Sequence, residues 1–210
     1  MALSFAVASG QVWADDATSP AMLITGTLTG PPPSVKSALQ YGVALTAETV
    51  ASPGPICGDS RSPCILGSGG GIAVRIGWRP NEHFYAGGAY AMSKQEPHQL
   101  YRVAILQQAR VEARWYFPTG REAAPFLLVG TGLGGYGNEW SVDTWGPSAS
   151  VGVGMEVQLG GPVLVVSLAY RPMYFRAWTD SSTLSHDAGI AHLIGLELAL
   201  EAQDIVQSAP

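Results

Sequence analysis

Two short stretches hold residue types that could do chemistry. Ser185-His186-Asp187 brings together the three side chains of a hydrolase triad. Such a triad needs its side chains to converge, whereas adjacent residues on a strand or loop point in different directions. We therefore expect these three residues to form a polar exposed loop. We predict a protein that is not an enzyme.

A glycine-rich stretch raises a second chemical hypothesis. Residues 130–135 read G-T-G-L-G-G, which matches the G-x-G-x-x-G fingerprint of dinucleotide sites. Glu156 even follows about 20 residues later, as that fingerprint asks. The fingerprint also needs a helix that starts within the glycines, and Gly137, Gly146 and Pro147 leave no room for one. Alternating glycines are more typical of a strand whose neighbours pack closely, so we predict no cofactor.

The two cysteines lie in one loop. Cys57 and Cys64 fall between Pro55 and Ile65. A metal site would need further ligands nearby, and none of the four histidines is in this loop. In an exported chain such a pair is typical of a disulfide. We predict a disulfide between them and no metal site.

The elements that must position these residues are strands. In Tyr101–Phe117 all four charged residues, Arg102, Arg110, Glu112 and Arg114, have even numbers, while the odd positions are mainly apolar. This period of two indicates a strand with one polar and one apolar face. The run would extend over about 55 Å, whereas strands of soluble domains usually have roughly 3 to 10 residues. This length is more typical of a strand in the wall of a membrane β-barrel.

The same alternation recurs along the chain and predicts eight strands in all. Short turns follow the second, fourth and sixth strands, and longer polar loops follow the first, third, fifth and seventh. This pattern predicts an all-β fold: an eight-stranded antiparallel up-and-down transmembrane β-barrel with short periplasmic turns and longer outer loops. The expected strands are Ser37–Val50, Gly71–Arg79, Phe84–Met92, Tyr101–Phe117, Phe126–Tyr136, Ser150–Leu159, Val163–Trp178 and a last one that includes Ile194–Glu201.

Composition agrees with this class. Charged residues make up 13% of the chain, which contains 26 glycines. No apolar run is long enough for a membrane-spanning helix. A net charge of -5 argues against nucleic acid as a partner. The partners we expect are outer-membrane lipids and a small solute or surface ligand.

The chain divides into four parts. Residues 1–14 are predicted to be a signal peptide, with an apolar core and small residues before Asp15 but no basic n-region. Residues 15–35 are rich in proline and are predicted to form a periplasmic lead-in. Residues 36–203 are assigned to the barrel and residues 204–210 to a C-terminal tail.

The charged residues indicate which face of each strand points into the barrel. A soluble lipocalin-type barrel would also alternate, but its apolar residues would point inward around a ligand. Here glutamates and arginines within strands nearly balance, counting Arg79, Arg102 and Arg171, and aromatic residues gather at strand ends as in an interfacial girdle. Facing inward, these charges could neutralise one another. The predicted lumen network is Glu48, Arg75, Arg110, Glu112, Arg114, Glu156, Glu197 and Glu201.

A family resemblance accompanies this pattern. The eight alternating segments, FLLVGTGLGGYG at residues 126–137 and the closing HLIGLELALEA at residues 192–202 resemble the small outer-membrane β-barrels of Gram-negative bacteria, the OmpA-like or OmpW-like porin superfamily. The resemblance covers roughly residues 36–203. It implies a barrel fold and location in the bacterial outer membrane. Activities on such a fold vary too widely to transfer.

Two function classes remain open. Trp140, Trp145 and Trp178 lie in or beside predicted outer loops, where aromatic rings could bind sugars or lipid headgroups, or anchor the barrel at the interface. Eight strands leave an interior just wide enough for side chains. We therefore predict a charge-plugged barrel that serves envelope integrity or surface binding. The alternative is a narrow channel or a lateral transporter for small or apolar solutes.

Overall fold

The computed structural model describes residues 37–54, 66–96, 102–117, 119, 122–179 and 185–206. Both cysteines, the signal peptide and the lead-in lie outside these ranges and stay predictions. The described residues form ten strands: β1 (Ala38–Ser52), β2 (Gly69–Asn81), β3 (Phe84–Gln95), β4 (Ala104–Tyr116), β5 (Ala123–Asn138), β6 (Thr144–Gln158), β7 (Val163–Phe175), β8 (Trp178–Thr179), β9 (Ser185–His186) and β10 (Gly189–Ile205). None of the described residues forms a helix long and apolar enough to cross a membrane.

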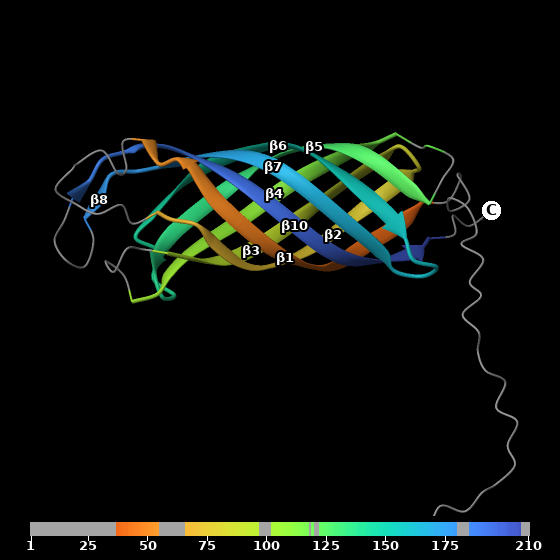
Figure 1. The fold of residues 1–210 in the computed structure, drawn as a ribbon, viewed down its shortest axis with the longest axis horizontal. Coiled ribbons are helices and arrows are strands. Elements are labelled where there is room, and N and C mark those ends of the chain that lie inside the picture. Colours follow the sequence, from red (N-terminus) through yellow and green to blue (C-terminus); the bar gives the residue numbers. More distant parts are fainter. Residues whose placement is uncertain are drawn as a thin grey trace, which may run out of the picture.

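Eight of these strands close into a barrel. Each long strand pairs antiparallel with the next along the chain, and β10 pairs with β1 from Ala38↔Ile205 onward to complete the circle. The strands run obliquely around the long axis (Figure 1). The predicted all-β, eight-stranded, up-and-down barrel is therefore confirmed. Closure removes every sheet edge, as a spanning sheet requires because lipid offers no hydrogen bonds to an unpaired backbone.

The connections define two ends, which we call the turn end and the loop end. Residues 82–83, 117–122 and 159–162 connect strands at the turn end, where β1 also starts and β10 ends. Residues 53–68, 96–103, 139–143 and 176–188 connect strands at the loop end. The short strands β8 and β9 pair with each other there (Figure 1). In outer-membrane barrels the longer loops face outward from the cell.

Strand boundaries differ from the sequence expectation, most clearly at β4, β5 and β6. β4 begins at Ala104, so Arg102 precedes the strand and pairs instead with exposed Glu139 at 3.4 Å. β5 and β6 are longer than expected, and their pairing is continuous from Tyr136↔Thr144 to Ala123↔Val157. The expected strands Phe126–Tyr136 and Ser150–Leu159 had left residues 137–149 as a connection. Proline removes one donor but leaves this hairpin pairing intact.

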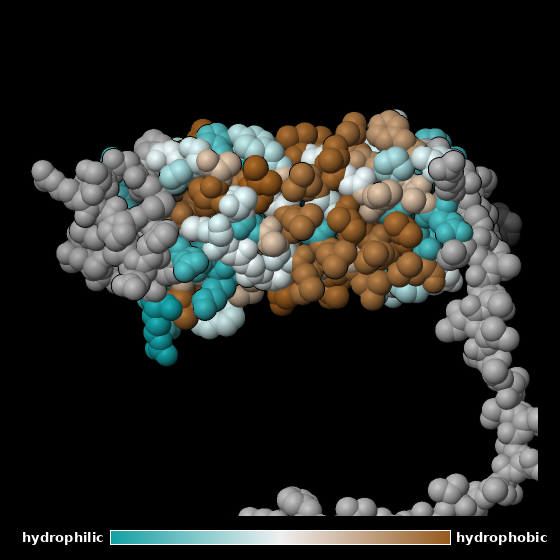
Figure 2. All heavy atoms as spheres, in the orientation of Figure 1, coloured by the Kyte–Doolittle hydropathy of each residue, from teal (hydrophilic) through white to brown (hydrophobic). Residues whose placement is uncertain are grey.

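The faces of the barrel are inverted relative to a soluble protein. Large apolar side chains point outward, and Val43, Ile72 and Val111 are each more than 60% exposed. Brown, apolar side chains dominate much of the visible wall in Figure 2. Arginine and glutamate side chains point inward, and Arg114 has no exposed surface. Such a wall is stable only where lipid covers it.

Candidate functional site in the barrel lumen

Ten charged side chains fill the lumen. Strand alternation turns them inward, because each has the parity of its strand's buried positions. Each is at most 8% exposed, and five arginines balance five glutamates. They are Glu48, Arg75, Arg79, Arg110, Glu112, Arg114, Glu156, Arg171, Glu197 and Glu201. Balance matters because an isolated buried charge would be costly.

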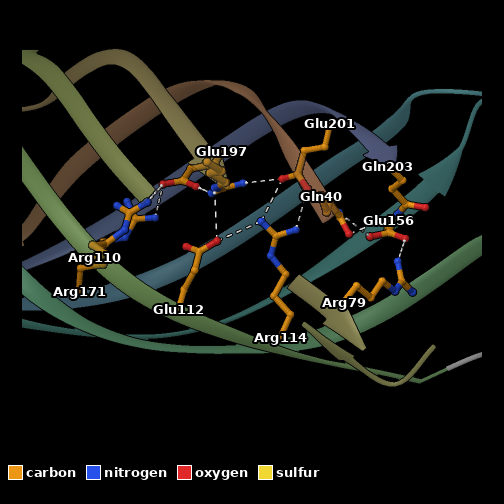
Figure 3. A network of polar contacts seen from close by, with 11 residues as sticks. Gln40, Arg79, Arg110, Glu112, Arg114, Glu156, Arg171, Glu197, Glu201 and Gln203 are labelled. Carbon is orange, nitrogen blue, oxygen red and sulfur yellow. Dashed lines mark hydrogen bonds and ion pairs between the residues drawn. The ribbon is translucent and has the colours of Figure 1, made fainter. Parts of the chain in front are cut away.

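Glu197 on β10 is the centre of this network. Its carboxylate contacts the guanidinium groups of Arg75 and Arg171 and accepts a hydrogen bond from Arg110 at 2.9 Å. Arg75 also approaches Glu112 at 3.5 Å and Glu201 at 3.4 Å. Three arginines from β2, β4 and β7 therefore converge on one carboxylate across the lumen (Figure 3).

Arg114 and Glu201 form the most regular pair. Two guanidinium nitrogens of Arg114 donate to the two oxygens of Glu201 at 3.1 and 3.0 Å. One of these nitrogens also donates to Glu112 at 3.1 Å, and Gln40 donates to Glu201 at 2.5 Å (Figure 3). Such a two-pronged contact is the strongest arrangement of these groups and fixes their orientation.

Towards the loop end, Glu48 accepts hydrogen bonds from neutral side chains. Gln108 donates to it at 2.5 Å, Ser93 at 2.6 Å and Gln95 at 3.1 Å. Arg171 adds a charged contact at 3.3 Å. A carboxylate can accept several hydrogen bonds at once, so protein donors alone satisfy this charge.

Towards the turn end, the charges are packed between aromatic rings. Arg79 donates to Glu156 at 2.5 Å, and its guanidinium lies 4.1 Å from the centre of the Tyr116 ring. Arg114 lies 4.5 Å from the centre of the Tyr85 ring. Desolvated cation–π contacts of this kind are worth about 2 kcal/mol. The rings cover the cations and fill the space beneath them.

Two apolar clusters complete the filling of the lumen. The loop-end cluster comprises Leu66, Ala104, Leu106, Tyr136, Met173, Phe175, Trp178, Ala191 and Leu193. The turn-end cluster includes Tyr85, Tyr116, Phe126, Val163 and Val165. Every one of these side chains is at most 8% exposed. The loop-end cluster thus lies beside the charged network, and the turn-end cluster is packed among its charges.

The structure brings together all eight charges that the sequence assigned to the lumen. Sequence reasoning left Arg79 and Arg171 out of that set. Arg79 shares the parity of Arg75 and could have been included, whereas Pro172 obscured the phase of the strand around Arg171. The neutral donors Gln40, Ser93, Gln95 and Gln108 carried no charge signal and were also missed.

The three tryptophans that the sequence placed in or beside outer loops have three different environments. Trp140 lies in the connection between β5 and β6 and is 76% exposed. Trp145 lies on β6, faces outward, and stacks with Arg176, whose guanidinium is 4.0 Å from the ring centre. Trp178 is only 8% exposed and stacks on His186 with ring centres 4.6 Å apart. Trp178 is thus part of the loop-end cluster rather than an exposed loop residue.

The two chemical motifs form no site in the described residues. His186 is buried against Trp178, while Ser185 and Asp187 are exposed on either side, so the three side chains diverge. Gly130–Gly135 lies within β5, with no helix after it among the residues described. No group of three or more His, Cys, Asp or Glu side chains in the described ranges could hold a metal ion.

No protein-family model matches the sequence, and no curated protein does. Solved structures do match the fold. Neisserial surface protein A (NspA) aligns with a TM-score of 0.53 at 14% identity, over 81% of this chain and 99% of that one. The outer membrane protein OprG from Pseudomonas aeruginosa aligns with a TM-score of 0.56 at 9% identity, over 82% of this chain and 98% of that one. The chain therefore shares the fold of these eight-stranded barrels, and its outer wall is apolar.

Proposed function

We propose that this protein is a closed, non-enzymatic barrel that serves the envelope as a rigid anchor and presents its loop end at the cell surface. The observation that carries the proposal is the filled lumen: a neutral network of five arginines and five glutamates, with an apolar cluster at the loop end and aromatic rings packed among the charges at the turn end. Neither water nor a solute has an obvious way through such an interior. Its mutual contacts make the barrel stiff.

Surface binding is the second part of the proposal. Trp140 and Val142 are the large apolar side chains most exposed in the loop-end connection between β5 and β6, at 76% and 47%. An exposed aromatic ring can bind a sugar or a lipid headgroup. A folded barrel would hold this connection at a fixed height above the membrane.

Single-channel recording from refolded protein in planar bilayers tests closure. We expect no steady conductance from the wild type. We also expect none from Arg110→Ala alone, because the loop-end cluster would still close the lumen. A Leu106→Ala/Phe175→Ala variant combined with Arg110→Ala should conduct more than either change alone. Large, steady channels in the wild type would support the alternative, a narrow passage for small solutes.

A further inference from the structure

A depression lies on the outside of the wall. It has a volume of about 760 Å³ and crosses five neighbouring strands, β1 to β5. Its outward-facing lining side chains are apolar or small: Tyr41, Val43, Val74, Ile76, Gly88, Tyr90, Ala109, Val111 and Leu133. Because these side chains face outward, the depression opens on the outer wall; Arg75, Ala89 and Arg110, whose side chains are buried, also contribute to its lining. We call it the wall groove.

Small residues create the floor of the wall groove. Gly88 pairs with Val111 and Tyr90 pairs with Ala109 across the β3–β4 ladder, so each small residue lies beside a large one. A Cβ atom added at Gly88 would meet only the Arg110 carbonyl oxygen, at 3.6 Å. The floor is therefore empty above the backbone. The Tyr90 hydroxyl donates to Gln107 at 2.8 Å, which holds one wall of the groove in place.

A cation lies beyond the groove towards the loop end. Lys94 is on the same face of β3 as Tyr90, about 13 Å further along the strand. It is exposed, and no ion pair joins it to a residue in the described ranges. Among the described strand residues that face outward, just Lys94 and Asp204 carry a charge, and Asp204 lies at the opposite end of the barrel.

We propose that the wall groove binds one acyl chain of a phosphate-bearing lipid of the outer leaflet, with the phosphate at Lys94. A flexible chain can follow an apolar groove across the wall, and a lysine near the membrane surface can reach the headgroup level. A second copy of the barrel fits less well. Two copies related by a two-fold axis at this groove would place both Lys94 side chains at the same depth, where they repel each other.

Native mass spectrometry of folded protein in micelles, with phosphatidylglycerol added, tests this proposal. The wild type should retain one lipid. Ala109→Leu fills the groove and should lower the retained fraction about tenfold, equivalent to about 1.4 kcal/mol. Ala149→Leu is the matched control, because Ala149 is also exposed on the outer wall but does not line the groove. That control should retain lipid like the wild type.

Two further variants separate the parts of the site. Gly88→Leu should act like Ala109→Leu, and Lys94→Gln should reduce the preference for phosphatidylglycerol over an uncharged-headgroup acylglycerol while the groove still binds the chain. Heat-dependent electrophoretic mobility verifies that each variant is folded. Equal lipid retention by Ala109→Leu and Ala149→Leu would overturn the proposal. So would a dimer that Ala109→Leu disrupts, because a second copy would then occupy the groove. Neither result bears on whether the lumen is closed.

Discussion

Arg110 and Val111 are neighbours on β4, yet their side chains face two different environments, the lumen and the outer wall. Arg110 is 6% exposed and donates to Gln108 at 3.1 Å and to Glu197 at 2.9 Å. Val111 is 66% exposed and meets whatever the membrane supplies. The inner face of the barrel is therefore built from directional contacts between particular partners. The outer face is built from contacts with interchangeable lipid chains.

This difference predicts two kinds of tolerance. An inward side chain has a fixed partner, so loss of either member leaves a buried charge uncompensated. An outward side chain needs only to be apolar, since lipid tails are as apolar as leucine. Loss or displacement of a partner should thus destabilise the inner face, and an introduced charge should destabilise the outer face.

The largest effect should follow loss of the central carboxylate. Glu197→Ala leaves Arg75, Arg110 and Arg171 facing one another, and we expect it to lower the free energy of unfolding by about 3–5 kcal/mol. The outward neighbour Leu196 is 49% exposed, and Leu196→Ala should have a much smaller effect. Urea titration of protein folded in lipid vesicles measures both.

A second variant shows whether charge balance is the cause. Glu197→Ala combined with Arg110→Ala removes one charge of each sign, so its destabilisation should be less than the sum of the two single changes. A double-mutant cycle gives this coupling directly. Additive effects would mean that the lumen residues act by volume alone, and the comparison of the two faces would lose its electrostatic basis.

The sequence predicted the strands and the inward charges because both depend on parity. A period of two needs only the pleat of the backbone and one lipid-covered face, so Glu48 and Glu201 could be assigned without knowing their partners. Partners depend on register around a closed barrel, which no local pattern contains. Glu197 is 87 positions from Arg110 and 26 from Arg171. Its central role became visible only in three dimensions.

The loop end was harder to predict for another physical reason. From the sequence, Trp178 was expected to be an exposed binding residue. Pairing of β8 with β9 instead places its ring on His186, at the loop end of the barrel. That pairing joins two-residue strands, which leave almost no periodic signal. The wall groove escaped prediction too, because it arises where small residues on adjacent strands come into register.

The next prediction concerns a charge introduced on the outer face. Val111→Arg places a charge near the middle of β4 on the lipid side and should destabilise the folded barrel by about 2–4 kcal/mol. Val142 is also exposed, but it lies in the loop-end connection. Val142→Arg should change stability by less than about 0.5 kcal/mol. Equal losses in a vesicle-based urea titration would contradict a lipid-covered wall.

The smallest effect compares one methyl group on each face. A Cβ atom added at Gly195 on β10 would overlap a guanidinium nitrogen of Arg171, so Gly195→Ala must displace that side chain from Glu48 and Glu197. We expect a loss of about 1–3 kcal/mol, as for other overpacked sites.

Gly88→Ala adds the same methyl group to the outer face. There the new Cβ would meet only one carbonyl oxygen at 3.6 Å, an ordinary contact. Alanine also loses less backbone entropy than glycine within a strand, so stability should be unchanged or slightly higher. Both variants can be compared by thermal unfolding in the same micelles. If Gly88→Ala proved as destabilising as Gly195→Ala, the outer wall would be packed against a specific partner. The description of this face as one that accepts interchangeable lipid chains would then be wrong.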